Sequence, residues 1–475
     1  MPNVACHVAW LLLLATAATG CTHYEPHPLP PAASAADFAQ RSLDNETLRD
    51  ALVPLLGRPL QQWPPQVWDR AQLLAVAIIQ NPELAVVRSN VAVALSEQRV
   101  ARELPNPGVT LQSEYARGEQ YTWLYGVGFD FLLLSPQRRR LNLDIAQHAL
   151  SRARWELAEK TWQVRRELAA ALADWQLARA RQPLLEQLLQ AQQRLLVIQQ
   201  RRVAAGEDAP SEVSVSQLAL LQAQQQQAAT RLQQFQAQAA VAAVLGVPPE
   251  ALDHVSVDWS DWGAPPPLDE ASLPGLREQA LLGRADLAQA IDEYAASEDR
   301  LQLEVARQYP QLQLEPGYYW DHGIAKWPLN LGLTLPLFNR NQGEIAAARA
   351  SREVSGQHLL AVQAEIYGAI ATAARADGLA ADAAASSARQ EQLAAEQSRR
   401  AELGLHAGAI DSSERVGAEV VALRAALDAL GMRAERQAAR NALEDALHAP
   451  LSGPERELGA PLLRSLAAAP VGNTP

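Results

Sequence analysis

Histidine and cysteine are the side chains of this 475-residue chain best suited to covalent or metal chemistry, and their spacing offers little of it. The nine histidines are scattered and never fall in a paired ligand spacing, and His406 is expected to be a solvated turn residue. No Walker A loop, G-x-S-x-G nucleophile elbow or H-E-x-x-H zinc motif occurs. We therefore expect no enzymatic activity, no cofactor and no metal site.

The cysteines point instead to export and lipid attachment. Cys6 and Cys21 flank an apolar run that is too short to span a bilayer, which is typical of a secretory signal over residues 1–20. The motif Ala18-Thr19-Gly20-Cys21 resembles a bacterial lipoprotein box, where cleavage leaves an acylated N-terminal cysteine, and Thr22 resembles the outer-membrane sorting pattern. We expect acylation of Cys21, with palmitate among the fatty acids; the alternatives are an ordinary cleaved signal or a mis-assigned start. Because one acyl chain anchors a protein only marginally, other contacts must hold it at its membrane.

Composition and charge favour a helical protein and disfavour nucleic acid as a partner. The 41 basic and 53 acidic side chains give a net charge of −12, the wrong sign for binding phosphate backbones. The chain is 48% hydrophobic, which excludes disorder of the whole chain. Aromatic residues make up only 5%, while Ala, Leu, Gln and Arg are abundant, as in long helices. We expect a mainly α fold.

Matching landmarks about 200 residues apart indicate one module present twice. Asn81 to Leu84 matches Arg284 to Leu287, and Ala205 to Glu212 matches Ala407 to Glu414, in the same order and with nearly the same spacing. The predicted organisation is a signal peptide at 1–20, an extended N-terminal segment at 21–70, a first repeat at 71–248, a linker at 249–270, a second repeat at 271–450 and a tail at 451–475.

Each repeat is expected to end in a long helical hairpin, over 138–246 and 340–448. No proline occurs between Pro336 and Pro450, and proline disrupts a helix interior by about 3 kcal/mol. Gly206 and Gly408 are predicted to form the turns of the two hairpins. Alternating steps of three and four residues predict a coiled-coil seam on the second helix of each hairpin, at Leu218, Leu221, Gln225, Ala228, Leu232, Phe235, Ala239 and Ala242, and at Val416, Val420, Leu423, Leu427 and Leu430.

Four segments ahead of the long helices have the period of strands and predict β-hairpins over 109–133 and 311–335. Their lengths are close to the roughly 9–11 residues that a tilted membrane strand needs. Aromatic residues near the hairpin ends are expected to face lipid or to form an interfacial girdle, at Trp123, Tyr125, Phe129, Tyr318, Trp320 and Trp327.

The strands have two interpretations. A half-buried sheet of a soluble domain would also show the period of two. If the strands enter lipid, four of them cannot close a barrel, and open edges would leave backbone groups unpaired at a cost of several kcal/mol each. A transmembrane β-barrel contribution therefore requires that the chain oligomerise.

Taken together, these residues resemble the TolC-like outer-membrane efflux factors. Leu335 to Phe338, followed by Gly343 to Arg349, is similar to the family's motif where a strand leads into a long helix. Pro105-Asn-Pro107 is similar to the start of its first strand, and Arg284 to Leu287 to the start of its second repeat. The likeness covers about residues 60–450.

The resemblance implies a homotrimer in which three four-stranded contributions complete one 12-stranded transmembrane barrel, continued by an α-helical barrel through the periplasm. It implies a passive exit duct of a tripartite pump for small solutes such as drugs or metal ions. The implied partners are a periplasmic adaptor (membrane fusion) protein, a proton-driven inner-membrane transporter and outer-membrane lipid. Two alternatives stay open: an exit duct for type I protein secretion, and a periplasmic coiled-coil scaffold without a channel.

The hairpin turns are where the resemblance implies a periplasmic gate. Glu212 and Glu414 follow Gly206 and Gly408 by six residues, so threefold symmetry would make each a ring of carboxylates. The alternative is carboxylates that stabilise a helix N-terminus. The two glycines are expected to contact the adaptor, with turn geometry alone as the alternative. The expected gate residues are Glu212, Asp411, Glu414 and Arg415.

Overall fold

The computed structural model describes residues 23–458 except 61, 119, 121, 134 and 457. The predicted signal peptide, the acylation site Cys21 and most of the predicted tail lie outside the described residues. The chain divides into two units, residues 1–42 and 43–475. The described part of the first unit contains helix α2 (Pro31–Ala39), which starts with a proline and buries no residue. All other elements belong to the second unit.

The segment 43–70 of the second unit is folded. Helix α3 (Glu46–Leu56) starts at Asn45, whose side chain accepts a hydrogen bond from the Thr47 backbone N–H at 2.9 Å. Strand β1 (Val67–Asp69) pairs in parallel with β4 (Ser256–Asp258) from the predicted linker. The expectation of an extended segment over 21–70 is therefore wrong for α2 and α3. The prolines of this segment obscured a helical period of buried leucines, which are Leu48, Leu52 and Leu56.

A short helix pair and a long helix pair occur in each repeat. At about 1.5 Å per residue, the 69 residues of α6 span about 100 Å, and the helix continues through Pro183. Within the described residues, no helix has both the length and the apolar character needed to cross a membrane. The first repeat contains α4 (Arg70–Gln80), α5 (Pro82–Arg102), α6 (Pro136–Ala204) and α7 (Pro210–Leu245). The second contains α8 (Leu273–Gly283), α9 (Ala285–Ala306), α10 (Gln342–His406) and α11 (Ser412–Leu447), and the connection between the repeats contains the 3-10 turns η1 (Pro249–Leu252) and η2 (Glu270–Ser272).

Local sequence explains where several of these helices start. Asp69 and Gln72 form a reciprocal capping box at α4. Asn81 accepts hydrogen bonds from the backbone N–H groups of Glu83 and Leu84 at 2.9 and 3.1 Å, and Pro82 occupies the first position of α5. The landmark Asn81 to Leu84 is therefore a helix start.

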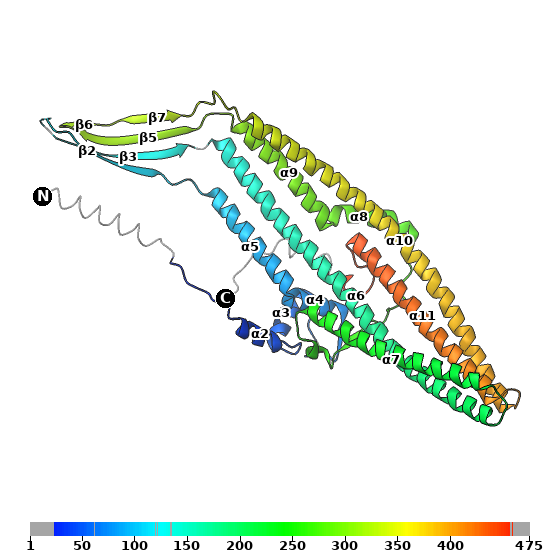
Figure 1. Cartoon of the computed structure of the whole chain (residues 1–475). Helices are drawn as coiled ribbons and strands as arrows, with labels where there is room; N and C mark the ends of the chain where they lie inside the picture. Colours follow the sequence, from blue (N-terminus) through cyan, green and yellow to red (C-terminus); the bar gives the residue numbers. More distant parts are fainter. Residues whose placement is uncertain are drawn as a thin grey trace. The chain divides into compact units, whose positions relative to one another are not determined.

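Helix α6 is the central element of the second unit. It packs against α5, α7, α9 and α11, as Figure 1 shows for the long helices. The largest apolar core lies in the first repeat and includes Leu73, Leu84, Leu168, Leu172 and Leu245, each at most 1% exposed. A smaller core in the second repeat includes Ile366, Ile370 and Leu443, and a third joins α6, α7 and α11 through Leu188, Ala223 and Val416.

The seam predicted on α11 is buried, whereas the seam predicted on α7 is largely exposed. Val416, Val420, Leu423 and Leu430 are at most 9% exposed. From residue 216 to residue 237, the buried positions of α7 are instead small residues seven apart, at Ser216, Ala223, Thr230 and Ala237, and only the end of the helix buries larger side chains. Within one chain the prediction for α7 is therefore wrong over most of the helix, although its last position, Ala242, is buried. An apolar stripe is left on the surface, at Leu218 (61% exposed), Leu221 (49%), Leu232 (57%) and Phe235 (62%).

The remaining strands form one antiparallel sheet (Figure 1). Its order is β2 (Gly108–Tyr115), β3 (Trp123–Leu133) and β5 (Leu312–Asp321), with β6 (Ile324–Lys326) and β7 (Leu329–Leu333) both paired to β5. The pairing of β3 with β5 joins the hairpins of the two repeats. The second strand of the hairpin expected over 311–335 is split into β6 and β7. Pro328 lies at the break, where it has no N–H to donate and its carbonyl accepts from Gly317 N at 2.9 Å.

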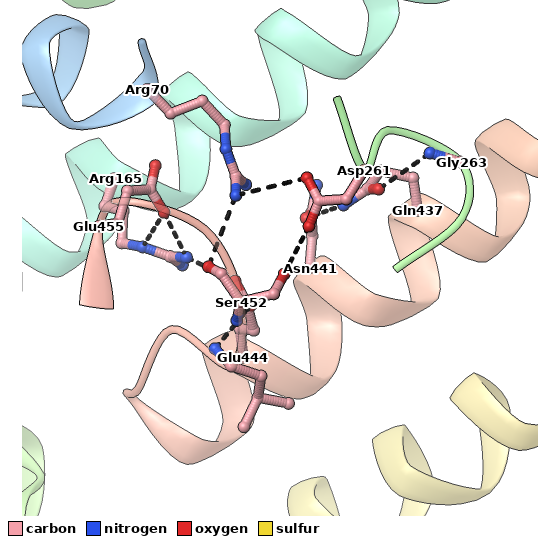
Figure 2. A network of polar contacts seen from close by, with 10 residues as sticks. Arg70, Arg165, Asp261, Gly263, Gln437, Asn441, Glu444, Ser452 and Glu455 are labelled. Carbon is pink, nitrogen blue, oxygen red and sulfur yellow. Dashed lines mark hydrogen bonds and ion pairs between the residues drawn. The ribbon is translucent and has the colours of Figure 1, made fainter. Parts of the chain in front are cut away.

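A buried polar network fastens the C-terminal segment to both repeats (Figure 2). Arg165 of α6 donates to Glu455 at 3.1 and 2.7 Å and also contacts Glu444 of α11. All three side chains are at most 5% exposed. Glu444 in turn accepts the backbone N–H of Leu451 at 2.8 Å. The described start of the tail is therefore a buried anchor.

A second arginine extends this network to α4 and to the connection between the repeats (Figure 2). The guanidinium of Arg70, 3% exposed, donates to the Ser452 carbonyl at 3.5 Å and lies 3.9 Å from Asp261. It also stacks 4.6 Å from the Trp259 ring centroid. Gly453 passes so close that a Cβ there would fall 1.9 Å from Arg70 Nη2. Gly453 also has φ 82°, so a larger residue here would be strained and would displace the Arg70 guanidinium.

We expect Arg165→Met to destabilise the protein by about 3–5 kcal/mol, because it leaves two buried carboxylates without their counter-ion. Chemical denaturation of the detergent-solubilised protein measures the loss. The neighbouring Arg166 is a matched control, since its side chain is 48% exposed where it pairs with Asp445, so Arg166→Met should cost at most about 1 kcal/mol. Equal losses for the two variants would show that the buried network does not stabilise the fold.

Candidate functional site

The two helical turns lie together at the end of the second unit opposite the sheet (Figure 1). Gly206 has φ 79° and Gly408 has φ 69°, in the left-handed region that favours glycine, and a Cβ on either would meet no atom within 4 Å. Each turn closes with a bond back into its helix, from Glu207 N to Arg202 O at 2.9 Å and from Ala409 N to Gly404 O at 2.8 Å. These are Schellman helix ends. Turn geometry therefore accounts for both glycines by itself, and the space around them is open.

Arg202 joins the two turns. Its guanidinium donates to Asp208 at 2.6 and 3.2 Å within its own turn and to Asp411 at 2.7 Å in the other. These hydrogen bonds hold the pKa of the Asp208 carboxyl below its usual range. We call Arg202, Asp208 and Asp411 the tip clasp. It is the direct ionic link between the last turn of α6 and the start of α11.

Sequence reasoning identified Asp411 but missed Arg202 and Asp208. The available signal was a basic residue in the last helical turn, with an acidic residue just beyond the turn glycine. The second repeat has Gly404 and Ile410 at the matching positions, so the duplication did not draw attention to the pair. The contact with Asp411 also depends on two turns lying side by side, which no spacing along the chain reveals.

Arg415 belongs to a separate ionic network. It contacts Glu402 of α10 at 3.3 Å and Glu419 of α11 at 3.1 Å, and Glu419 also binds Arg194 of α6. The structure thus places Asp411 in an ion pair between the two hairpins, whereas both ion pairs of Arg415 lie within the second hairpin and Glu419 makes the link to Arg194 of the first. All of these groups are at least partly exposed to solvent, so each pair is weak by itself.

Glu212 and Glu414 lie in the first turns of α7 and α11 and are exposed. Within the described residues, neither carboxylate forms an ion pair. The Glu414 backbone N–H donates to Asp411 Oδ1 at 2.8 Å, which makes Asp411 the N-cap of α11. Both glutamates are therefore available for contacts outside this chain, in positions that also suit a helix N-terminus.

The sheet has one apolar face, built from the residues that the strand register places opposite one another. Tyr125 pairs with Trp320, Val127 with Tyr318, and Phe131 with Leu314, which in turn pairs with Leu331 of β7. Cross-strand partners share a face, so one continuous apolar surface crosses all strands. Its large side chains are exposed, including Leu111 (80%), Trp123 (54%), Tyr125 (53%) and Leu331 (64%).

Aromatic contacts concentrate at the end of the sheet away from the helices. Tyr125 stacks on Trp320 with ring centroids 6.5 Å apart, Tyr115 meets Trp123 at 5.1 Å, and Tyr318 meets Trp327 at 4.7 Å. Phe129 stacks instead on Phe131, nearer the helices. The structure brings Trp123, Tyr125, Tyr318, Trp320 and Trp327 into one region, and places Phe129 apart from it.

The opposite face of the sheet is polar and rich in glycine. The register places Gln112, Glu114, Asp130, Glu315 and Asn330 on this face. Tyr319 lies flat over it: a Cβ on Gly126 would fall 2.1 Å from the Tyr319 ring and 2.7 Å from the Tyr318 carbonyl oxygen. Gly126 therefore makes room for the ring. The sheet separates an apolar side from a polar side, as a wall between lipid and water does.

Residues 73–247 match the family model described as Outer membrane efflux protein. No curated protein matches the sequence significantly. Solved structures with the same fold include the outer-membrane channel OprN, 16% identical with a TM-score of 0.66, and CusC, 16% identical with a TM-score of 0.65. Both alignments cover 90% of this chain and 99% of the other. The outer membrane protein VceC from Vibrio cholerae is 17% identical with a TM-score of 0.64, over 80% of this chain and 95% of its own.

These comparisons agree with the geometry of the sheet and of the helical hairpins. The matched family segment runs from within α4 to just past the end of α7, and the structural alignments extend over both repeats. Residues 73–247 belong to the outer membrane efflux protein family, and the chain has the mostly helical fold of the TolC-like outer-membrane efflux channels.

Proposed function

We propose that three copies of this chain form a passive exit duct for small solutes through the periplasm and the outer membrane. The observation that carries the proposal is the sheet, whose exposed apolar face and polar, glycine-rich face are joined to helices about 100 Å long. Soluble monomeric proteins rarely expose a large continuous apolar surface to water, and such a surface typically contacts a membrane or another protein. In the outer membrane it would face the acyl chains, with the aromatic cluster at an interface.

The edges of the sheet support a trimer. Within the described residues, no strand pairs with the outer edge of β2 or with the outer edges of β6 and β7. In hydrocarbon, each unpaired backbone group would cost several kcal/mol. Pairing β2 of one copy with β6 and β7 of the next satisfies both edges. Three copies would give a barrel of 12 strands if β6 and β7 count as one interrupted strand.

The apolar stripe on α7 supports the same assembly. Leu218, Leu221, Leu232 and Phe235 follow the spacing of a coiled-coil seam but have no partner within the described residues. In the proposed trimer, the partner of this stripe is a long helix of a second copy of the chain. Packing α7 against a neighbouring copy would continue the barrel as a helical tunnel.

The tip clasp and the charged residues beside it are proposed as the periplasmic gate. Arg202 and Asp411 hold the two hairpins of one copy together, Arg194 and Glu419 add a second link, and Arg415 binds Glu419 within the second hairpin. Glu212 and Glu414 would form carboxylate rings at the pore mouth. Gly206 and Gly408 lie in open space, where a periplasmic adaptor could contact them. An inner-membrane transporter, proton-driven, would supply the energy, and acylation of Cys21 would add a second anchor to the outer membrane.

We expect the detergent-solubilised protein to have three chain masses by light scattering corrected for bound detergent, and to conduct ions in planar bilayers. The physical reason is the unpaired strand edges, which only neighbouring copies satisfy. A water-soluble, monomeric protein without conductance would exclude the duct and would favour a periplasmic scaffold.

Loss of the tip clasp should widen the pore. We expect Arg202→Gln to raise single-channel conductance, because it removes the ion pairs with Asp208 and Asp411 together. Asp411→Asn should have a smaller effect, since it removes one of these pairs and keeps an N-cap oxygen. The neighbouring Arg201, which forms no ion pair within the described residues, is the control: Arg201→Gln should leave conductance unchanged. Equal conductance in all variants would show that the tip clasp is not part of the gate.

The clasp should weaken in acid. An unfolded aspartate has a pKa of about 3.9, and Asp208 lies below its usual value, so the native tip holds fewer protons than an open one. Its stabilisation is complete above about pH 5 and is lost as the pH falls through the native pKa. Hydrogen exchange of residues 203–209, corrected for intrinsic rates, should be faster in Arg202→Gln than in wild type at pH 7. The difference should become smaller as the pH falls below about 4, and a difference as large at pH 3 as at pH 7 would contradict this account.

A further inference from the structure

A histidine occupies the left-handed cap of α11, where the first repeat has glycine. His448 has φ 48° and directly follows Leu447, the last residue of the helix. In the first repeat, Gly246 has φ 73° and follows Leu245 in the same way. Positive φ is unfavourable for residues with a Cβ, and glycine is the usual residue at such caps. Helix termination alone would be served better by glycine, so the imidazole ring is the feature to explain.

The His448 ring points into the protein toward an unsatisfied carboxylate. Its side chain is 9% exposed and stacks on Trp162 with centroids 5.1 Å apart. Nδ1 lies 3.6 Å from Glu159 Oε2 on α6, too far for a hydrogen bond. That oxygen is buried and has no hydrogen-bond partner among the described residues, and no described residue hydrogen-bonds to the ring. Two potential ligand atoms therefore face each other without a group between them.

Asp286, in the first turn of α9, completes the cluster. Ligand atoms of Glu159, Asp286 and His448 all lie within 4.8 Å of one another. Arg284 donates to both oxygens of the Asp286 carboxylate, with bonds of 2.6 and 3.0 Å. A carboxylate oriented in this way is typical of the support that metal ligands receive from their neighbours.

The charges around the cluster favour a cation. Asp445 is the remaining acidic group, bound by Trp162 Nε1 at 2.9 Å and by Arg166 at 3.2 Å. When Glu159 is ionised and the imidazole is neutral, Glu159, Asp286 and Asp445 give three negative charges against two positive charges from Arg166 and Arg284, so the site is negative by one. A divalent ion would reverse this excess.

We propose that Glu159, Asp286 and His448 bind a divalent transition-metal ion, with zinc as the best fit. Zinc accepts imidazole nitrogen and carboxylate oxygen at about 2.0–2.2 Å, and water can occupy a fourth position. Small movements of three side chains would close the site. The ion would join α6 of the first repeat to the start of α9 and the end of α11 in the second, as a structural tie. The sequence predicted no metal site, because these ligands are not paired along the chain and lie on three separate elements.

Zinc binding to the metal-stripped full chain in detergent tests the proposal, with a chromophoric chelator as competitor. We expect one zinc ion per chain and a rise in Tm on adding zinc. His448→Gly copies the cap of the first repeat, so the helix end should be preserved while affinity falls at least tenfold and the shift in Tm disappears. Glu159→Gln should weaken binding in the same way and serves if His448→Gly does not fold by circular dichroism.

The matched control is His148, whose ring lies 3.1 Å from Asp292 and 3.5 Å from Asp299 and is the other histidine with two nearby carboxylates. His148→Gln should bind zinc as the wild type does. A wild type that binds no zinc, or His448→Gly and Glu159→Gln variants that bind it with wild-type affinity, would overturn the proposal. Loss of binding in His148→Gln alone would assign the ion to the other cluster and would overturn it equally.

Discussion

One guanidinium on the longest helix determines how the two repeats meet. Arg165 is held by a carboxylate from α11 and by another from the C-terminal segment, and none of the three groups is open to water. Buried charges are tolerated only when each finds its partner in good geometry, so this contact fixes α6, α11 and the chain end in one arrangement. Because α5, α7 and α9 also pack on α6, the same contact sets both helical turns at one end of the unit and all strands of the large sheet at the other.

The two repeats share a plan and differ where they touch. Their second long helices, α7 and α11, have 36 residues each, and both hairpins turn through a left-handed glycine. The differences that matter lie at helix ends, where one repeat carries a polar side chain and the other a small residue or glycine. The matched pairs are Arg202 with Gly404, Ala209 with Asp411, and Gly246 with His448. In each pair the polar member reaches a residue of the other repeat, so loss of internal symmetry has created contacts between the repeats.

Sequence alone predicted the features that depend on neighbours along the chain. The absence of proline between Pro336 and Pro450 predicted α10 and α11, and alternation of apolar residues predicted β2, β3 and β5. Features that depend on the angle of a helix or on contacts across the chain were missed. The spacing of the large residues of α7 predicts a seam but does not say which face of the helix packs on α6. In the structure, a row of small residues lies on that face. The roles of the site residues remain predictions. The contact between Arg202 and Asp411 could be found only once both turns were placed.

The pairing of β3 with β5 inside each chain has a genetic consequence. Because β3 pairs with β5 within one polypeptide, the junctions between copies in the proposed ring are all of one kind. Each joins β2 of one copy to β6 and β7 of the next. In the proposed trimer every copy contributes one sheet edge to each of two junctions, so damage to one edge of one copy spoils one of the three junctions of its ring. Damage to the β2 edge should therefore behave as a dominant trait when mutant and normal chains are made together, since mixed rings cannot close.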